Sequence, residues 1–272
     1  MSTPKRPPEI LYKYFPPERH PFFLKPLLRF APFKSLNDPF EGQLVYGGYF
    51  APNAFANDKK SVINLFHDMF FMNDKVGKRK HDDEEILEWG MEFNDCSIDK
   101  LNSYYNSYKD KIDLGILSLS EVYDNELMWA HYSKSHTGFV VGFNSSHSFF
   151  SKCNDDYEYF GVRRVRYYRK RQKQYAANNS VDFMVNFFSK SYNWRYEKEW
   201  RVIQSGISKL NEYGVIGLVE VDYTAIKSIY LGLNVDSQVE ALARKFSAEH
   251  DGVLLKKANL HPSQYTIEFI DI

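Results

Sequence analysis

The stretch Trp194-Arg195-Tyr196-Glu197-Lys198-Glu199-Trp200-Arg201, written WRYEKEWR, places two glutamates one residue apart between two tryptophans and two arginines. Successive side chains of a β-strand point to opposite faces, so a strand here would put Glu197, Glu199 and Arg201 on one side. The two carboxylates would then stand about 6.5 to 7 Å apart. Such a pair suits a reaction at an anomeric carbon, where one carboxylate stabilises an oxocarbenium-like cation and the other activates the nucleophile.

The same alternation has a purely structural interpretation. On a half-exposed strand, Arg195 and Arg201 would pair with the two glutamates. Such solvated ion pairs contribute little to stability and carry no chemistry. The spacing alone is compatible with both interpretations.

Outward from this stretch, strand patterns occupy both ends of the chain. Alternation at 115–120 and short apolar or extended segments elsewhere predict strands at 10–15, 27–33, 115–120, 138–143, 160–168, 215–221, 226–232, 253–256 and 265–270. Helical spacing predicts helices at 61–71, 126–133, 180–194 and 235–250. Because the strands flank a helical middle and lack regular βα alternation, we expect an α+β fold. The length favours a single domain over residues 1–272, with a helical insertion at about 51–110 that includes an exposed connection at 73–85.

Composition excludes several classes of protein. Lys and Arg number 35 and Asp and Glu number 35, so the whole molecule has no net field to attract nucleic acid or an acidic membrane. Cys96 and Cys153 form no CxxC spacing, which excludes a thiolate zinc site and a disulfide framework. The glycine-rich phosphate-binding loops and the nucleophile elbow are absent. Without a signal peptide or an apolar run of about 20 residues, the predicted location is the cytoplasm, with no membrane contact.

One segment is locally basic. The sequence GVRRVRYYRKRQKQY, residues 161–175, holds seven Lys and Arg residues with aromatic and aliphatic residues between them. Basic side chains with interleaved aromatics are typical of nucleic-acid contacts, although a solvated strand and turn has the same composition. The predicted nucleic-acid-binding residues are Arg163, Arg164, Arg166, Arg169, Lys170 and Arg171.

Several motifs carry a family resemblance. The pieces LYKY, SLNDPFEG, GILSLSE, LMWAHYSKSHTGFVVGF and YEKEWRVI, in this order over most of the chain, resemble an uncharacterised bacterial family known as a domain of unknown function. More loosely, the order is similar to the ADP-ribosyltransferase superfamily: a first strand with a basic residue, a later Ser-x-Ser segment, and a Glu-x-Glu strand. This resemblance implies a split β-sheet core and NAD as the substrate.

The resemblance also assigns roles to residues of this chain. It implies that Glu199 stabilises the ribosyl cation and that Glu197 orients or deprotonates the acceptor. The residues that it implies for NAD binding are Tyr12, Lys13, Tyr14, Ser118, Ser120, His131 and Tyr132. Lys13 departs from the superfamily's Arg or His, because lysine is a point charge without a planar fork; Arg29 or His131 would have to substitute for it.

The expected activity is therefore NAD-dependent ADP-ribosylation of a macromolecule, either nucleic acid or protein. The resemblance further implies a bacterial toxin or anti-phage effector with an antitoxin partner. Two alternatives stay open. The first is a non-enzymatic nucleic-acid-binding module built around residues 163–173. The second is a metal-dependent nuclease that uses Asp38 and Glu41 of the NDPFEG turn.

Overall fold

The computed structural model describes residues 6–41, 45–49, 113–151, 159–171, 173–176, 187–209, 212 and 214–272. The strands of the first half are β1 (Ile10–Phe15), β2 (Leu27–Arg29), β3 (Ala31–Pro32), β4 (Val45–Tyr49), β5 (Leu114–Ser120) and β6 (Phe139–Asn144). Those that follow are β7 (Tyr159–Arg164), β8 (Arg166–Tyr168), β9 (Lys173–Ala176), β10 (Ser189–Ser191), β11 (Glu199–Ser205), β12 (Leu218–Glu220), β13 (Ile226–Leu231), β14 (Leu254–Leu260) and β15 (Ile267–Asp271). The α-helices are α4 (Glu126–Tyr132) and α6 (Ser237–Glu249), and the 3-10 helices include η1 (Pro17–Phe23), η2 (Phe33–Ser35) and η5 (Tyr192–Glu197).

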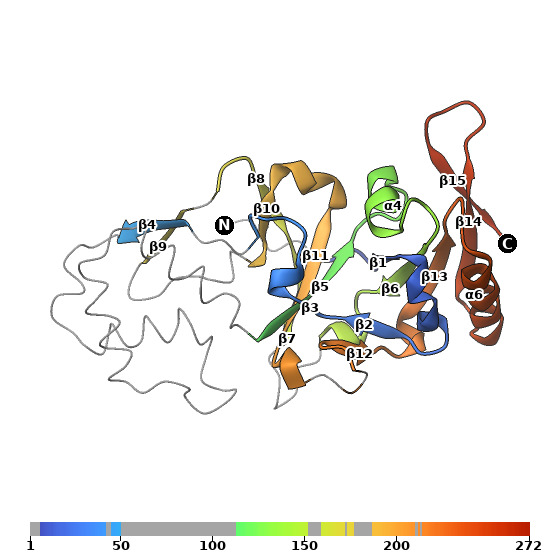
Figure 1. The fold of residues 1–272 in the computed structure, drawn as a ribbon, viewed down its shortest axis with the longest axis horizontal. Coiled ribbons are helices and arrows are strands. Elements are labelled where there is room, and N and C mark those ends of the chain that lie inside the picture. The colour runs from blue at the N-terminus through green and yellow to red at the C-terminus, as the bar shows by residue number, and fades with distance from the viewer. Residues whose placement is uncertain are drawn as a thin grey trace.

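A nine-stranded mixed sheet forms the centre of the molecule (Figure 1). Its order is β15-β14-β13-β6-β1-β5-β11-β7, with β3 paired to β5. β13 and β14 run parallel, whereas β6, β1, β5 and β11 are antiparallel to their neighbours. A large sheet accompanied by few helices in the described part of the chain agrees with the predicted α+β class. The predicted helices and connection within 51–110 lie outside the described residues.

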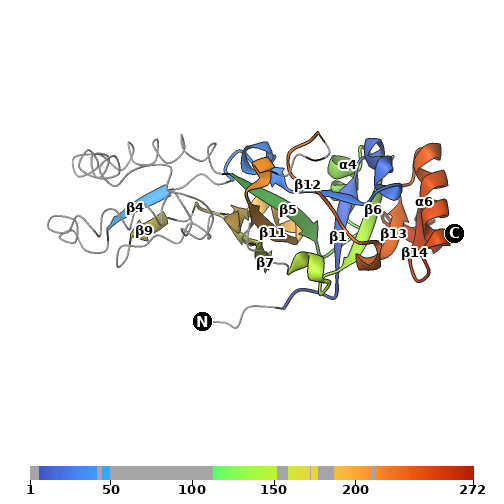
Figure 2. The ribbon, with the colours of Figure 1, turned by 90° about the horizontal axis from the view of Figure 1, so that it is seen from below.

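The two faces of the sheet differ in character. One face carries the larger apolar core, built on alternate strand residues such as Leu11, Leu117 and Val202 and covered by η1 and α6. Figures 1 and 2 show α6 beside β14 at the C-terminal end of the sheet. The opposite face packs against α4. Asn125 caps the N-terminus of this helix, since its side chain accepts a hydrogen bond from the Met128 N–H. On this second face the alternation places the serines of β5 and the charged residues of β11.

The predicted strands are largely confirmed, with two informative differences. The expected strand at 27–33 divides into β2 and β3, because Phe30 interrupts the ladder and donates its N–H to the Gly217 carbonyl. The expected strand at 160–168 divides into β7 and β8 at the buried Val165. Gly115 allows β3 to approach β5, since an added Cβ would lie 2.7 Å from the Cβ of Phe30.

The predicted helix at 180–194 ends early in its described part, where residue 187 is α-helical but the residues after it are not. Residues 189–191 instead form β10, which pairs in parallel with β8, and residues 192–197 form η5. Phe188 supplied part of the helical spacing, but it packs with Phe187 into an apolar cluster that includes Phe33 and Ile203. Tertiary pairing with β8 therefore overrides the local helical pattern.

Candidate active site

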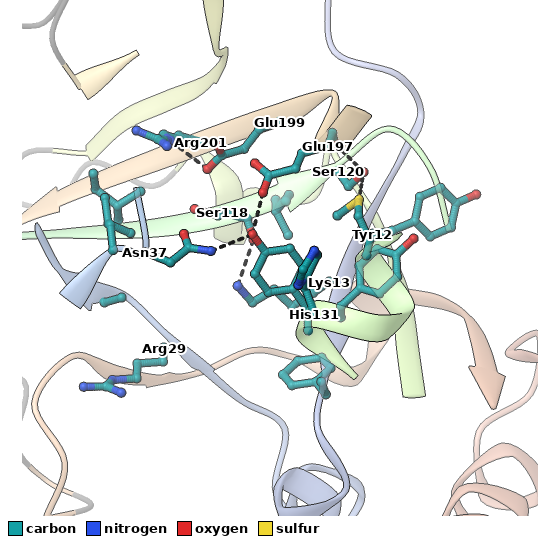
Figure 3. A pocket seen from close by; sticks show the side chains of 18 of the residues that line it. Tyr12, Lys13, Arg29, Asn37, Ser118, Ser120, His131, Glu197, Glu199 and Arg201 are labelled. Atoms are coloured by element: carbon teal, nitrogen blue, oxygen red, sulfur yellow. Dashed lines mark hydrogen bonds and ion pairs between the residues drawn. The ribbon is translucent and has the colours of Figure 1, made fainter. Parts of the chain in front are cut away.

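The main sheet opens between β1 and β5. β1 pairs with β6 along its whole length, yet it meets β5 only where Tyr12 lies opposite Ser120. Further along the same edge of β5, β3 pairs with Ile116 and Gly115. A cavity of about 700 Å³ lies at this opening, with walls from β1, residues 16–37, β5, α4, β10 and the start of β11 (Figure 3).

The cavity brings together every residue that the sequence predicted for the acid pair and for NAD binding. These residues come from four separate parts of the chain: Tyr12, Lys13, Tyr14, Ser118, Ser120, His131, Tyr132, Glu197 and Glu199. Arg29, the suggested substitute for a first-strand arginine, also lines it. The chain thus gathers these side chains in one recess, although their chemical roles stay predictions.

The sequence predicted that both glutamates lie on one strand, but the structure differs. Glu197 is the last residue of η5, and β11 begins at Glu199. Lys198 between them has a left-handed backbone with a φ of 43°, which turns the chain sharply and removes strict alternation. The two carboxylates nevertheless converge, and each residue is only 3 % exposed.

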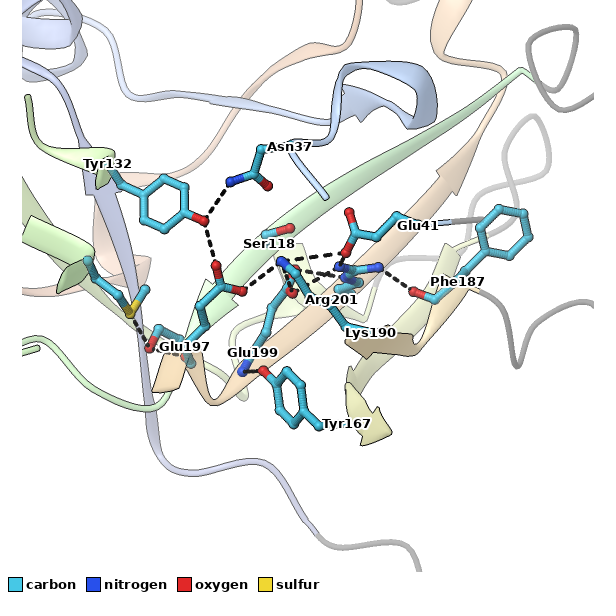
Figure 4. Close-up of polar contacts among 12 residues, drawn as sticks. Asn37, Glu41, Ser118, Tyr132, Tyr167, Phe187, Lys190, Glu197, Glu199 and Arg201 are labelled. Atoms are coloured by element: carbon cyan, nitrogen blue, oxygen red, sulfur yellow. Dashed lines mark hydrogen bonds and ion pairs between the residues drawn. The ribbon is translucent and has the colours of Figure 1, made fainter. Parts of the chain in front are cut away.

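Lys190 is the side chain on which the carboxylates converge (Figure 4). Its ammonium group lies 2.7 Å from Glu197 Oε2, 3.2 Å from Glu199 Oε2 and 3.5 Å from Glu41 Oε1. The same ammonium lies 4.9 Å from the centre of the Trp194 ring. Because the three acids surround it, Lys190 stays charged: burial lowers its pKa, but the carboxylates outweigh burial and raise it.

Arg201 holds the other side of Glu199. The guanidinium is fully buried, and it donates from Nε to Glu199 Oε1 at 2.7 Å and from Nη2 to Glu199 Oε2 at 2.9 Å. It also donates to Glu41 Oε1 and, at 2.7 Å, to the Phe187 carbonyl. Arg195, by contrast, is exposed and stacks on Tyr192. The interpretation of this stretch as a salt-bridged strand is therefore wrong in pairing Arg195 with a glutamate. Its other pair, between Arg201 and Glu199, is present and buried.

The two glutamates differ in their protonation behaviour. Burial raises the pKa of Glu199, but the charges of Arg201 and Lys190 outweigh it and bring the pKa down to about 2. Burial raises the pKa of Glu197, and the charge of Lys190 only partly offsets this increase. One carboxylate is thus permanently ionised near neutral pH, while its neighbour is the better proton acceptor.

Hydroxyl groups position Glu197 within the cavity. The Tyr132 hydroxyl donates to Glu197 Oε1 at 2.5 Å and accepts a hydrogen bond from Asn37 Nδ2 at 2.8 Å. The Ser120 hydroxyl donates to the Glu197 backbone carbonyl at 2.7 Å, and Ser118 lies close enough to hydrogen-bond the Glu199 side chain. Ser118 and Ser120 therefore support the acid pair directly.

Cationic side chains lie on the opposite side of the cavity. Lys13 spans the opening, since its Nζ donates to the Ser118 carbonyl at 2.9 Å. Burial lowers the pKa of Lys13 to about 8, although the negative charge of Glu199 partly raises it. Arg19 donates to the Leu27 carbonyl at 2.8 Å and lies 5.9 Å from the Phe15 ring centre. Arg29 is exposed at the same side, and Figure 3 shows its guanidinium apart from the acid pair.

The aromatic residues of the site fall into two groups. Tyr12 packs against Tyr123 and Tyr230, and the Tyr14 hydroxyl donates to the Val122 carbonyl, so both rings are held by the core beneath α4. His131, from α4, is exposed at the cavity rim.

The predicted nucleic-acid-binding residues form a separate, exposed surface. Arg163 and Arg164 end β7, Arg166 begins β8, and the residues 169–171 follow β8. None of them lines the cavity. The turn residues of the nuclease alternative are instead buried, with Glu41 bound to Arg201 and Lys190. In the described ranges no group of three or more His, Cys, Asp or Glu side chains is placed to hold a metal ion.

Sequence reasoning missed Lys190 and Arg19 as members of the site. Lys190 sits in a stretch with a helical pattern, and nothing in its local sequence indicates that it meets Glu197. The turn at Asn37 was predicted, but its hydrogen bond to Tyr132 joins residues 95 positions apart. Such contacts depend on the tertiary fold, so no local pattern reveals them.

Comparison with known families bears on the segment that carries this chemistry. Residues 128–202 match the family described as Protein of unknown function (DUF2971). This segment is similar to that family of unknown function. It runs from α4 into β11 and includes Tyr132, Lys190, both glutamates and Arg201, which confirms the resemblance to a domain of unknown function over this range. No curated protein and no solved structure matches the chain. No helix in the described ranges is long and apolar enough to cross a bilayer.

Proposed function

We propose that this cavity binds NAD as a substrate and transfers its ADP-ribosyl group to a macromolecular acceptor. One observation carries the proposal: a single recess of about 700 Å³ holds an ionised carboxylate beside a more basic one, with cations on its opposite side. The looser resemblance to ADP-ribosyltransferases supports it, because Lys13, Ser118, Ser120, Glu197 and Glu199 are the residues that the resemblance matched.

The charges of the site suit cleavage of the bond between nicotinamide and ribose. When that bond breaks, its electron pair goes to the ring nitrogen, and nicotinamide leaves as a neutral molecule. The ribosyl C1′ becomes cationic. Glu199, with its pKa at about 2, supplies a fixed negative charge for this cation. The acceptor atom then bonds to C1′, and Glu197 takes the proton that the acceptor loses.

The cavity also suits the rest of a dinucleotide. Its volume lies within the range of about 300 to 1,000 Å³ that is usual for ligand pockets. Lys13, Arg19 and Arg29 line it and complement the two negative charges of a diphosphate. Lys13 is already engaged with the Ser118 carbonyl, so we assign the main diphosphate contact to Arg29.

The proposal is tested by following nicotinamide release from NAD by the purified protein. We expect release by the wild type, and a rise in KM of about tenfold in Arg29→Gln, since a charge-assisted hydrogen bond is worth about 1.5–3 kcal/mol. The kcat should change little because Arg29 does not contact the acid pair. Arg244→Gln, on the exposed face of α6, is the matched control and should leave KM unchanged. No NAD binding by calorimetry and no nicotinamide release would contradict the proposal.

The pH dependence of release provides a second prediction. Glu197 works as a carboxylate, so activity should fall as the pH drops through its raised pKa. The hydrogen bond from Tyr132 favours the ionised form and lowers this pKa. In Tyr132→Phe the acidic limb of the rate profile should therefore move to higher pH, by about one unit.

Tyr14→Phe is the control for this pH shift. It also loses one hydroxyl hydrogen bond, but its partner is the Val122 carbonyl and not a carboxylate. Its acidic limb should stay in place. If the acidic limb of the rate profile stays in place in Tyr132→Phe, Glu197 is not the proton acceptor. The role as a toxin or anti-phage effector, the antitoxin and the cytoplasmic location rest on the sequence alone and stay predictions.

A further inference from the structure

A dense basic surface lies outside the cavity. It is formed by exposed side chains of β7 and β8, the residues after β8, η5 and the residue after η5, namely Arg163, Arg166, Arg169, Lys170, Arg171, Arg195 and Lys198. The whole chain has equal numbers of acidic and basic residues, so this concentration of positive charge is a local feature. Arg164 points to the other face of β7 from Arg163 and pairs with Glu121 at 3.4 Å. We call the seven residues named above the basic surface.

Aromatic rings hold several of these arginines in place. The guanidinium groups of Arg169 and Arg195 lie 4.3 and 4.4 Å from the centre of the Tyr192 ring. The Arg163 guanidinium lies 5.8 Å from the centre of the Phe188 ring. A stacked guanidinium keeps its edge N–H groups available while it loses rotational freedom, so less entropy is lost when it binds a phosphate.

The basic surface is connected directly to the acid pair. β8 and β10 pair in parallel with Tyr167 opposite Lys190, so the basic strand lies beside the strand that supplies the central lysine. The Tyr167 hydroxyl accepts a hydrogen bond of 2.7 Å from the Glu199 backbone N–H (Figure 4). Arg195 and Lys198 flank Glu197 in the sequence. A molecule bound on the basic surface would therefore lie beside the strands that hold the acid pair.

We propose that the basic surface binds single-stranded nucleic acid and that this strand is the acceptor of the ADP-ribosyl group. Positive charges along an extended segment match a phosphate backbone. Trp194 and Tyr196, only partly buried in η5, provide ring faces for unpaired bases. A nucleotide oxygen or nitrogen forms the new bond to C1′, and its proton passes to Glu197. The transfer step rests on the proposed function, whereas binding of the strand does not.

Binding is tested without NAD, by fluorescence anisotropy with labelled single-stranded RNA and single-stranded DNA of mixed sequence. Arg166→Gln/Arg169→Gln removes two charges from the basic surface. We expect it to weaken binding about tenfold and to reduce the slope of log K against log salt by about 1.4. Lys227→Gln/Lys245→Gln removes two exposed charges from β13 and α6 and should bind like the wild type.

Three outcomes would overturn the inference. These are no binding of either strand at low salt, equal weakening in the control variant, and duplex DNA or polyglutamate binding as tightly as the single strands. A preference between RNA and DNA identifies the natural class of strand. The transfer step is tested by transfer of label from NAD to the strand, which should fall in Arg166→Gln/Arg169→Gln while nicotinamide release without nucleic acid stays unchanged. If binding is present but release is absent, the proposed function fails and the nucleic-acid surface stands.

Discussion

Nicotinamide release from NAD should fall by about 10³-fold in Glu199→Gln, because the variant removes the fixed negative charge beside the cationic carbon. With its pKa at about 2, Glu199 is fully ionised at neutral pH, so the amide changes its charge completely. The shape of the side chain is nearly preserved. We expect the loss to appear in kcat, since the charge matters most when C1′ becomes cationic.

Glu41→Gln is the matched control for this experiment. Glu41 binds the same two cations, Lys190 and Arg201, but it does not line the cavity. Both variants therefore remove one carboxylate partner of Lys190 and Arg201, and their melting temperatures can be compared directly. If Glu41→Gln lost as much activity as Glu199→Gln, the effect would belong to the network as a whole and the specific role of Glu199 would be refuted.

The largest effect on stability is expected for Arg201→Met. Its guanidinium is fully buried and forms hydrogen bonds to Glu199, Glu41 and the Phe187 carbonyl. The variant leaves two buried carboxylates with Lys190 as their remaining cationic partner. Breaking a buried ion pair from one side costs about 3–5 kcal/mol, and we expect a loss of this size in the free energy of unfolding at pH 7. Urea unfolding followed by tryptophan fluorescence measures it.

The loss of stability in Arg201→Met should depend on pH in a defined direction. The pKa of Glu199 in the wild type, about 2, lies below the ordinary value of 4.5. Its ion pairs therefore stabilise the fold above about pH 4.5 and lose this effect as the pH falls toward 2. The stability difference between wild type and Arg201→Met should shrink over that range. Arg244→Met, at an exposed pair with Glu240, should change stability by less than about 0.5 kcal/mol. A loss under about 1 kcal/mol in Arg201→Met would contradict the importance of the buried network.

Local patterns predicted most of the strands, whereas the family resemblance named most residues of the candidate site. Alternation located β1, β5 and β6 to within a residue or two, since each has one face against an apolar core. The pairs of serines and glutamates that the resemblance named line the cavity. Their position follows from pairing that places Ser120 opposite both Tyr12 and Glu199.

Tertiary contacts decided what the sequence did not reveal. The stretch at Lys190 has helical periodicity, but it forms a strand because β8 offers a pairing edge. The strand predicted through Glu197 is interrupted by the left-handed backbone of Lys198, a conformation that lysine seldom adopts and that no spacing rule anticipates. Arg201 was interpreted as an exposed partner, and only the fold shows that it is buried.

The narrow junction between β1 and β5 divides the sheet into two leaves, and the chain passes repeatedly from one leaf to the other. β1, β6 and β13 belong to one leaf, whereas β5, β7 and β11 belong to the other. The strands of the two leaves are interleaved along the sequence. Neither leaf corresponds to a continuous stretch of polypeptide. The recess at the junction therefore cannot be transferred to another protein as one continuous peptide, because its lining residues come from the separate ranges 12–37, 116–134 and 190–201.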